Sequence, residues 1–301
     1  MAAKSKLKAV DPKSAEPSRP KLLIFGKAGV GKTWTSIDFP SCYYIDTEGG
    51  ANLSHYTDKL KKAGGVYFGP DQGSQDFEEV IKQVEALATE THSYRTLIID
   101  SISKLYNAEI SREAERLGDK DAFGASKKPA INLSRRLVSW IDRIDMNVIL
   151  IAHEKAMWAK GEQIGVTFDA HDKLEYELDL CLNIQKMGDS RKAFVKKSRL
   201  LEFPDASSFE WSYAEFAKKY GKDIIERTSQ PVILATAEQL AELNKLLETV
   251  KLPDGETEKW LKKANVETFA EMDTAKVAAC ITALKSKISP PEEVKTKAQG
   301  E

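Results

Sequence analysis

The sequence is short of cysteine, and it has no long apolar run. Its three cysteines are far apart, which argues against a disulfide framework and against a clustered metal site. No apolar segment approaches the length that crosses a bilayer, and the N-terminus lacks the apolar core of a signal peptide. These absences argue against a membrane-spanning or secreted protein. We therefore expect reduced thiols and a cytoplasmic location.

Neither sign of charge is in excess. The 301 residues include 45 Lys and Arg and 46 Asp and Glu, which gives a net charge of −1. Such a balance provides no global basic field for nucleic acid, so any surface of that kind must be local. The hydrophobic share of 42% and the charged share of 30% suit a soluble globular protein. The length is typical of about two domains.

What the sequence does contain is a glycine-rich segment directly after an apolar run. Lys21 to Phe25 predicts a buried parallel strand, and residues 26–33 (GKAGVGKT) fit G-x-x-x-x-G-K-[ST], the Walker A motif. We call these eight residues the phosphate loop. Its glycines let backbone N–H groups turn toward phosphate oxygens, its lysine reaches the β- and γ-phosphates, and its threonine hydroxyl can ligate Mg²⁺.

The motif predicts binding of ATP with Mg²⁺. A glycine-rich turn with an accidental lysine is the weaker alternative. The predicted cofactor-binding residues are those of the loop and the residue after it: Gly26, Lys27, Ala28, Gly29, Val30, Gly31, Lys32, Thr33 and Trp34.

Polar residues follow three further apolar runs. The runs at 42–45, 96–99 and 147–152 predict strands, and they are followed by Glu48, Asp100 and His153. Ligands of open α/β sheets bind beyond the carboxyl ends of the strands, so these side chains are candidates for one site. Asp100 fits a Walker B aspartate that holds Mg²⁺ together with Thr33, although a strand-terminal aspartate can also be a turn former.

Strands that alternate with helices predict an α/β fold with right-handed crossovers and a mostly parallel sheet flanked by helices. Ser74 is the predicted N-cap of one helix, and Thr236 opens a capping box with Gln239 in a C-terminal helical region. Loops are expected over 107–128 and 154–172. The expected organisation is a disordered tail over 1–19, an ATPase core over 20–228, a helical domain over 229–288 and a disordered tail over 289–301.

The phosphate loop, YIDTEG at 44–49, TLIIDS at 96–101 and ILIAHEK at 149–155 together resemble the RecA-like ATPases of bacteriophages, specifically the Sak-type single-strand annealing and recombination group. The resemblance covers about residues 20–215. It implies a RecA-like core and a DNA-stimulated, Mg²⁺-dependent ATPase of the host cytoplasm. It also implies binding of single-stranded DNA, self-assembly into oligomers or filaments, and annealing or strand exchange. A single-strand-binding protein is a further expected partner, and no membrane is.

The resemblance also implies roles for particular residues. Glu48 would orient the attacking water, and His153 would replace the polar residue, commonly glutamine, that contacts the γ-phosphate. Lys197 and Arg199 would serve the γ-phosphate of a neighbouring subunit, although a solvated basic strand edge is a serious alternative. The two predicted loops would be the DNA-binding loops, and the candidate contacts are Lys155, Trp158, Lys160 and Phe168.

Two other classes of protein stay open. One is a ring-forming helicase or helicase-loader ATPase. The other is an annealing protein whose ATP site only gates assembly. A small-molecule kinase is disfavoured, because nothing resembles an arginine-rich lid and Glu48 lies where hydrolases need a carboxylate.

Overall fold

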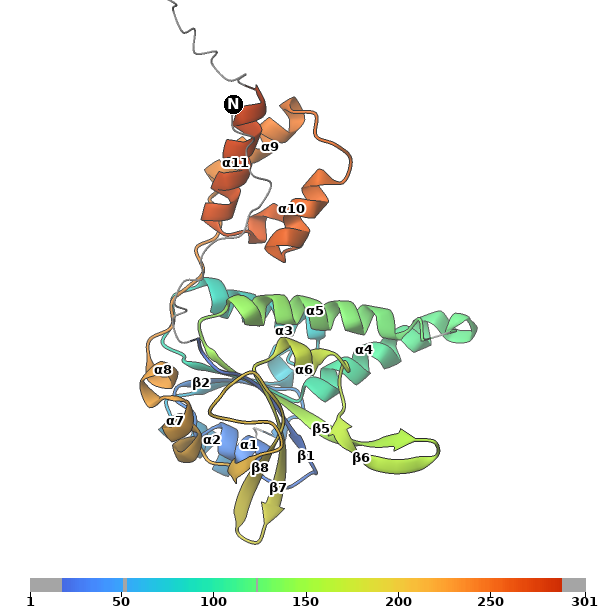
Figure 1. The fold of residues 1–301 in the computed structure, drawn as a ribbon, viewed down its shortest axis with the longest axis vertical. Coiled ribbons are helices and arrows are strands. Elements are labelled where there is room, and N and C mark those ends of the chain that lie inside the picture. Colours follow the sequence, from blue (N-terminus) through green and yellow to red (C-terminus); the bar gives the residue numbers. More distant parts are fainter. Residues whose placement is uncertain (1–17, 51–52, 123, 289–301) are drawn as a thin grey trace, which may run out of the picture.

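The fold is that of a computed structural model, which describes residues 18–50, 53–122 and 124–288. Within these residues, nine strands join one sheet (Figure 1). They are β1 (Lys21–Gly26), β2 (Cys42–Asp46), β3 (Val66–Phe68), β4 (Thr96–Asp100), β5 (Asn147–Ala159), β6 (Glu162–Phe168), β7 (Leu180–Met187), β8 (Ser190–Ser198) and β9 (Ser208–Glu210).

The strand order is β3-β2-β4-β5-β1-β7-β8-β9, and β6 pairs with β5 alone. The strands from β3 to β7 in this order are parallel, whereas β8 and β9 are antiparallel. Gly26 at the end of β1 lies opposite His153, and Asp46 lies opposite Asp100. The register therefore brings the carboxyl ends of β1, β2, β4 and β5 to one edge of the sheet.

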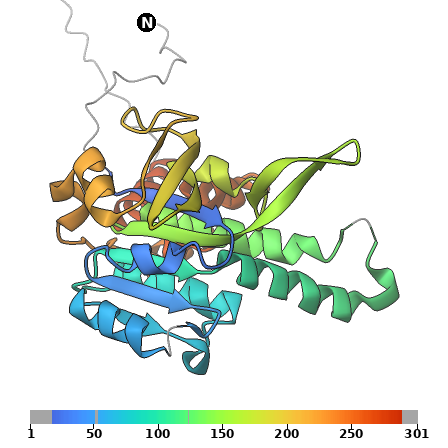
Figure 2. The same ribbon diagram turned by 90° about the horizontal axis from the view of Figure 1, so that it is seen from below.

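Helices cover both faces of this sheet (Figures 1 and 2). One face carries α3 (Phe77–Thr89), α4 (Ile102–Leu117), α5 (Lys127–Arg143) and the short α6 (Leu174–Glu177). The other face carries α1 (Lys32–Ser36), α2 (Ser54–Lys62), α7 (Tyr213–Tyr220) and α8 (Lys222–Glu226). The predicted α/β class, with a mostly parallel sheet flanked by helices, is confirmed.

Strand β1 shows why both faces must be covered. Leu23 and Phe25 pack into the core under α3 to α5, whereas Leu22 and Ile24 pack into the core under α1, α2 and α7. All four side chains are at most 1% exposed. A near-continuous apolar strand is stable only when helices bury it on both sides.

Three further helices form a unit beyond α5: α9 (Ala237–Thr249), α10 (Glu256–Ala264) and α11 (Thr274–Ile288) (Figure 1). They enclose a core of their own that includes Leu243, Met272, Val277 and Leu284. The predicted capping box is present, since Thr236 accepts a hydrogen bond from the N–H of Gln239 and the Gln239 side chain accepts one from the N–H of Thr236.

This unit contacts the sheet domain through α5. Arg143 donates hydrogen bonds to the Glu271 carbonyl at 2.7 Å and to Asp273 at 2.9 Å. Arg136 forms an ion pair with Glu267 at 3.3 Å. The contact is therefore polar, and it lies on the far side of α5 from the sheet.

The predicted N-cap Ser74 is wrong. Helix α3 begins at Phe77, and its N-cap is Asp76, whose side chain accepts a hydrogen bond from the N–H of Glu79 at 3.0 Å. The Ser74 hydroxyl instead donates to the carbonyl of Asp46, which ties the start of this segment to the end of β2.

Both predicted loops are largely regular structure. Residues 102–117 form α4, which buries only a narrow apolar face that includes Leu105 and Tyr106, so its helical period is weak in the sequence. Residues 154–168 form a two-stranded hairpin, because β5 continues to Ala159 and pairs antiparallel with β6. We call this hairpin the β arm. It projects on the same side of the molecule as the α4–α5 hairpin (Figures 1 and 2).

Residues 1–17 and 289–301 of the predicted tails lie outside the described residues. Arg19, however, is 2% exposed and joins three parts of the chain. Its guanidinium donates to the carbonyls of Ile225 and Arg227 and pairs with Asp145 at 3.4 Å. The prediction that the tail extends through residue 19 is therefore wrong for this residue.

We expect Arg19→Ala to lower the free energy of unfolding by about 3 kcal/mol, because the change leaves buried acceptors without a donor. Lys222→Ala is the matched control, since it removes an ion pair with Glu226 in which the lysine side chain is 65% exposed. That control should lose less than about 1 kcal/mol. Urea unfolding of both variants measures the difference, and equal losses would contradict the anchoring role of Arg19.

Candidate active site

The phosphate loop turns directly out of β1 into α1. Gly31 has φ +88°, in the left-handed region that favours glycine, and it is the N-cap of α1. Gly26 has no room for a side chain, because a Cβ there would lie 2.3 Å from the carbonyl oxygen of Ile184. The predicted strand, glycine turn and helix therefore form as the motif requires.

Lys32 is held over the inner side of this loop. Its Nζ donates hydrogen bonds to the carbonyls of Gly26 at 2.8 Å and Lys27 at 3.0 Å. Burial lowers the pKa of Lys32, while the nearby carboxylates of Asp100 and Glu48 act to raise it. The ammonium group thus lies at the cavity with the loop backbone around it, where it can meet an anionic ligand.

Asp100 ends β4 beside the loop. Its Oδ2 accepts hydrogen bonds from the Thr33 hydroxyl and from the Tyr44 hydroxyl, the latter at 3.2 Å. Burial raises the pKa of Asp100 to about 6, although the hydrogen bond from Thr33 opposes this. The peptide bond between Asp100 and Ser101 is cis.

The pairing of Thr33 with Asp100 fits a Mg²⁺ site. Mg²⁺ is usually held by one or two protein oxygens together with phosphate oxygens and waters. Among the described residues, no group of three or more His, Cys, Asp or Glu could hold a metal ion. Thr33 and Asp100 would hold the ion, which would neutralise phosphate charge.

Glu48 follows β2 in a turn that Asp46 organises. The Asp46 Oδ1 accepts from the N–H groups of Glu48 at 3.0 Å and Gly49 at 2.9 Å, so this carboxylate has a structural role in the turn. The Glu48 Oε1 accepts from the Ser101 hydroxyl at 2.7 Å and lies 2.5 Å from the His153 Nε2. Burial acts to raise the pKa of Glu48, but the hydrogen bonds from Ser101 and His153 outweigh it and the pKa is lowered.

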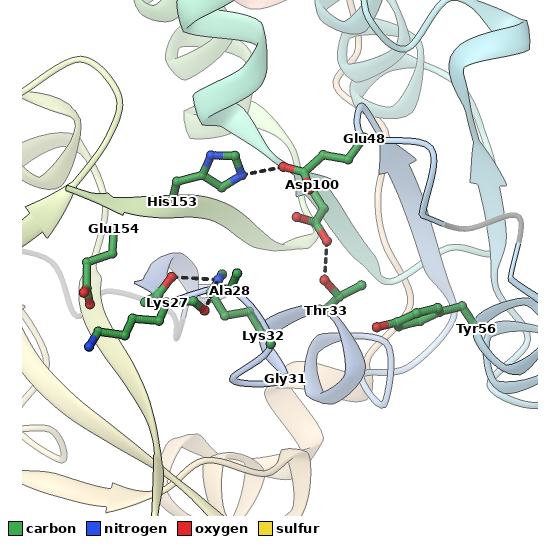
Figure 3. Close-up of a pocket in the computed structure, with 12 residues that line it drawn as sticks. Lys27, Ala28, Gly31, Lys32, Thr33, Glu48, Tyr56, Asp100, His153 and Glu154 are labelled. Carbon is green, nitrogen blue, oxygen red and sulfur yellow. Dashed lines mark hydrogen bonds and ion pairs between the residues drawn. The ribbon is translucent and has the colours of Figure 1, made fainter.

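His153 lies where β5 leaves the sheet. The imidazole contacts Glu48, and the backbone N–H of His153 donates to the Ser103 hydroxyl at 2.8 Å. Both the side chain and the backbone of the histidine are therefore held in place. The imidazole is half exposed. This arrangement gives the Glu48 carboxylate a defined orientation toward the cavity (Figure 3).

These residues surround one cavity of about 500 Å³. It is lined by Gly26, Lys27, Ala28, Gly29, Gly31, Lys32, Thr33, Glu48, Tyr56, Asp100, His153 and Glu154 (Figure 3). The four predicted elements of the site, namely the phosphate loop, Glu48, Asp100 and His153, are thus brought together. Two predicted residues do not line it: Val30 packs into the core at 8% exposure, and Trp34 packs beside Tyr56.

Sequence reasoning missed Tyr56 and Glu154, which lie at opposite ends of this cavity (Figure 3). Tyr56 packs 4.4 Å from His55 and 5.7 Å from Trp34 between ring centroids, so its ring belongs to an aromatic cluster at the loop. Such a ring offers a face on which a nucleobase can stack. The one signal for Tyr56 in the sequence is that it follows Glu48 by only eight residues.

Lys197 and Arg199 lie away from the cavity. Ser198 pairs with Leu180, which in turn pairs with Leu22, so this end of β8 lies at the edge of the sheet opposite the phosphate loop. Lys197 and Arg199 donate to the carbonyls of Leu178 and Tyr176 in their own chain. That Lys197 and Arg199 contact the γ-phosphate of a neighbouring subunit stays a prediction.

The predicted DNA contacts have different surroundings. Phe168 is 3% exposed and packs edge-to-face on Phe25, so it is not available to stack on a base, and this prediction is wrong. Trp158 is 65% exposed on the β arm, and Lys160 lies exposed at its turn. Lys155 is paired with Asp172 at 3.3 Å and with Asp169 at 3.7 Å.

A family model described as an AAA domain matches residues 18–209. Curated proteins give no match. Among solved structures, a RadB recombinase is similar at 19% identity over 64% of this chain and 86% of that chain, with a TM-score of 0.43. An ATPase from the type III secretion system of pathogenic bacteria is similar at 14% identity over 88% of this chain and 79% of that chain, with a TM-score of 0.36.

We expect Lys32→Ala to abolish nucleotide binding or turnover, because it removes the charge at the β- and γ-phosphate positions. Lys61→Ala is the matched control, because Lys61 is exposed on α2 and does not line the cavity. Titration with a fluorescent ATP analogue measures the affinity, and circular dichroism checks the fold. Unchanged affinity and turnover in a folded Lys32→Ala protein would remove the basis of the phosphate site.

Glu48→Gln should keep ATP binding but slow hydrolysis by about 100-fold or more, because an amide cannot polarise water as a carboxylate does. Glu154→Gln is the matched control, since Glu154 lines the same cavity but accepts from Asn183 at 3.2 Å rather than from His153. Steady-state phosphate release measures both. If the two variants are slowed equally, Glu48 has no special role in orienting water.

Proposed function

The chain belongs to the AAA-domain family of P-loop ATPases, and on that premise we propose a DNA-dependent function. In this proposal it is a Mg²⁺-dependent ATPase, stimulated by single-stranded DNA, that promotes annealing or strand exchange in phage recombination. The observation that carries the proposal is the continuity of β5. One strand holds His153 against Glu48 and then extends without a break into the β arm.

The β arm has the surface that contact with a single strand needs. Trp158 and Met157 are 65% and 41% exposed, and Ile164 is 61% exposed. Exposed aromatic rings allow stacking of bases of any sequence, and nearby lysines such as Lys160 meet the phosphate backbone. The chain as a whole has a net charge of −1 and so no general basic field. Binding of DNA would therefore depend on a local surface of this kind.

The geometry also supports hydrolysis of ATP at the phosphate loop. The loop with Lys32 would hold the phosphates, and Thr33 with Asp100 would hold Mg²⁺. Glu48, oriented by Ser101 and His153, would accept a hydrogen bond from water in line with the γ-phosphate. A ligand that displaces the β arm would move His153, and with it the orientation of Glu48.

Two alternatives differ in their assembly and turnover. A ring-forming helicase or loader would appear as closed rings in electron microscopy, with or without DNA. An annealing protein with an ATP gate would show almost no turnover even with single-stranded DNA. Binding of a single-strand-binding protein and assembly along DNA stay proposals.

No described helix combines the length and apolarity that a bilayer crossing requires.

The ATPase rate with and without single-stranded DNA tests this function, and Trp158→Ala makes the test specific. We expect DNA to raise the wild-type rate and Trp158→Ala to lower DNA affinity by about tenfold, since stacking contributes roughly 1–3 kcal/mol per base. Tyr176→Ala is the matched control, because Tyr176 is 60% exposed but lies on α6 rather than on the β arm. Fluorescence anisotropy of a labelled oligonucleotide measures affinity.

A wild-type ATPase rate that single-stranded DNA does not change would contradict the proposed role of the β arm. Equal DNA affinity for Trp158→Ala and wild type would contradict it as well. A loss of affinity in Tyr176→Ala as large as that in Trp158→Ala would move the DNA surface away from the β arm.

A further inference from the structure

Arg191 contacts the phosphate loop from outside the cavity. It lies on β8, and its Nε donates a hydrogen bond to the carbonyl of Val30 at 3.0 Å. Its guanidinium also packs on Gly31, where a Cβ would lie only 2.0 Å from the Nε. The absence of a side chain at Gly31 thus makes room for the arginine as well as for the turn.

The contact determines which way one peptide unit points. The Val30 carbonyl and the Gly31 N–H belong to the same trans peptide unit, so they point in opposite directions. Because Arg191 holds the carbonyl on the outside, the N–H is turned toward the inside of the loop, where Gly31 lines the cavity. A cationic donor on a carbonyl also polarises the amide, which makes its N–H a better donor.

Arg191 itself is held by the sheet. Arg191 pairs with Lys186 of β7, and the backbone carbonyl of Arg191 accepts a hydrogen bond from the N–H of Trp211 at 2.7 Å. The neighbouring strand β7 closes on the other end of the loop, since the Ile184 carbonyl leaves Gly26 no space for a Cβ. The β7–β8 hairpin therefore supports the phosphate loop at both ends.

We propose that Arg191 is a positioning residue for phosphate binding. It aims the Gly31 N–H at a phosphate oxygen and places a fixed positive charge behind the loop. The inference rests on nucleotide binding by the loop and does not depend on DNA. The rival explanation is a bond that only stabilises the fold.

Three substitutions separate the bond from the charge. Arg191→Ala removes both, Arg191→Gln retains an N–H donor without charge, and Arg191→Lys retains charge without the planar guanidinium. Lys192→Ala is the matched control, because the next residue of a strand points to the other face of the sheet. The probe is N-methylanthraniloyl-ADP, titrated by fluorescence in the presence of Mg²⁺, and thermal unfolding is recorded without nucleotide.

We expect Arg191→Ala to raise the Kd of the probe about tenfold or more, with smaller increases for the other two Arg191 variants and no change for the control. In turnover, KM should rise while kcat changes less than about threefold, because the contact is made equally in the ground and transition states. An unchanged Kd for Arg191→Ala would overturn the proposal. So would a Kd change that is matched by an equal loss of nucleotide-free stability and is absent in the folded Gln and Lys variants.

The titration contains no DNA, so its result can be interpreted even if the proposed DNA-dependent function is wrong. If wild-type protein does not bind the probe, nucleotide binding itself fails, and that outcome is distinct from a negative result for Arg191.

Discussion

The parallel pairing of β5 between β1 and β4 is the constraint on which the site depends. It sets the phosphate loop opposite His153 and places Asp100 one strand away. The pairing is stabilised by apolar side chains on both faces of the strands, and Leu150 and Ile151 of β5 are fully buried. A shift of this register by one residue would exchange the buried faces and separate His153 from Glu48. The chemistry at the edge of the sheet is thus specified by packing inside it.

Much of the candidate site could be predicted because its residues follow apolar strands in the sequence. Glu48, Asp100 and His153 are each close to the end of such a run, and parallel strands end at one edge. Their mutual contacts could not be predicted, since the bond between Ser101 and Glu48 depends on the path of two separate turns.

Strand direction explains another limit of the sequence. The basic residues from Arg191 to Lys197 lie along one strand and Arg199 directly follows it, and nothing in their pattern indicates which end reaches the phosphate loop. Because β8 runs antiparallel to β7, Arg191 contacts the loop and Lys197 lies at the opposite edge. The β arm was missed for a related reason. Its strands are stabilised mainly by pairing with each other, and their one alternation of apolar residues, at Ile164, Val166 and Phe168 of β6, is short.

The β arm also has a consequence for the molecule before it meets any ligand. Among the described strands, β6 pairs with β5 alone, so one side of the arm presents backbone N–H and C=O groups that a strand from another molecule could join. Exposed Met157, Trp158 and Ile164 increase that hazard, whereas Glu162 and the irregular pairing at Met157/Trp158 reduce it. The outer edge of the arm is therefore a surface at which two copies of the chain can pair, and these two features oppose such pairing.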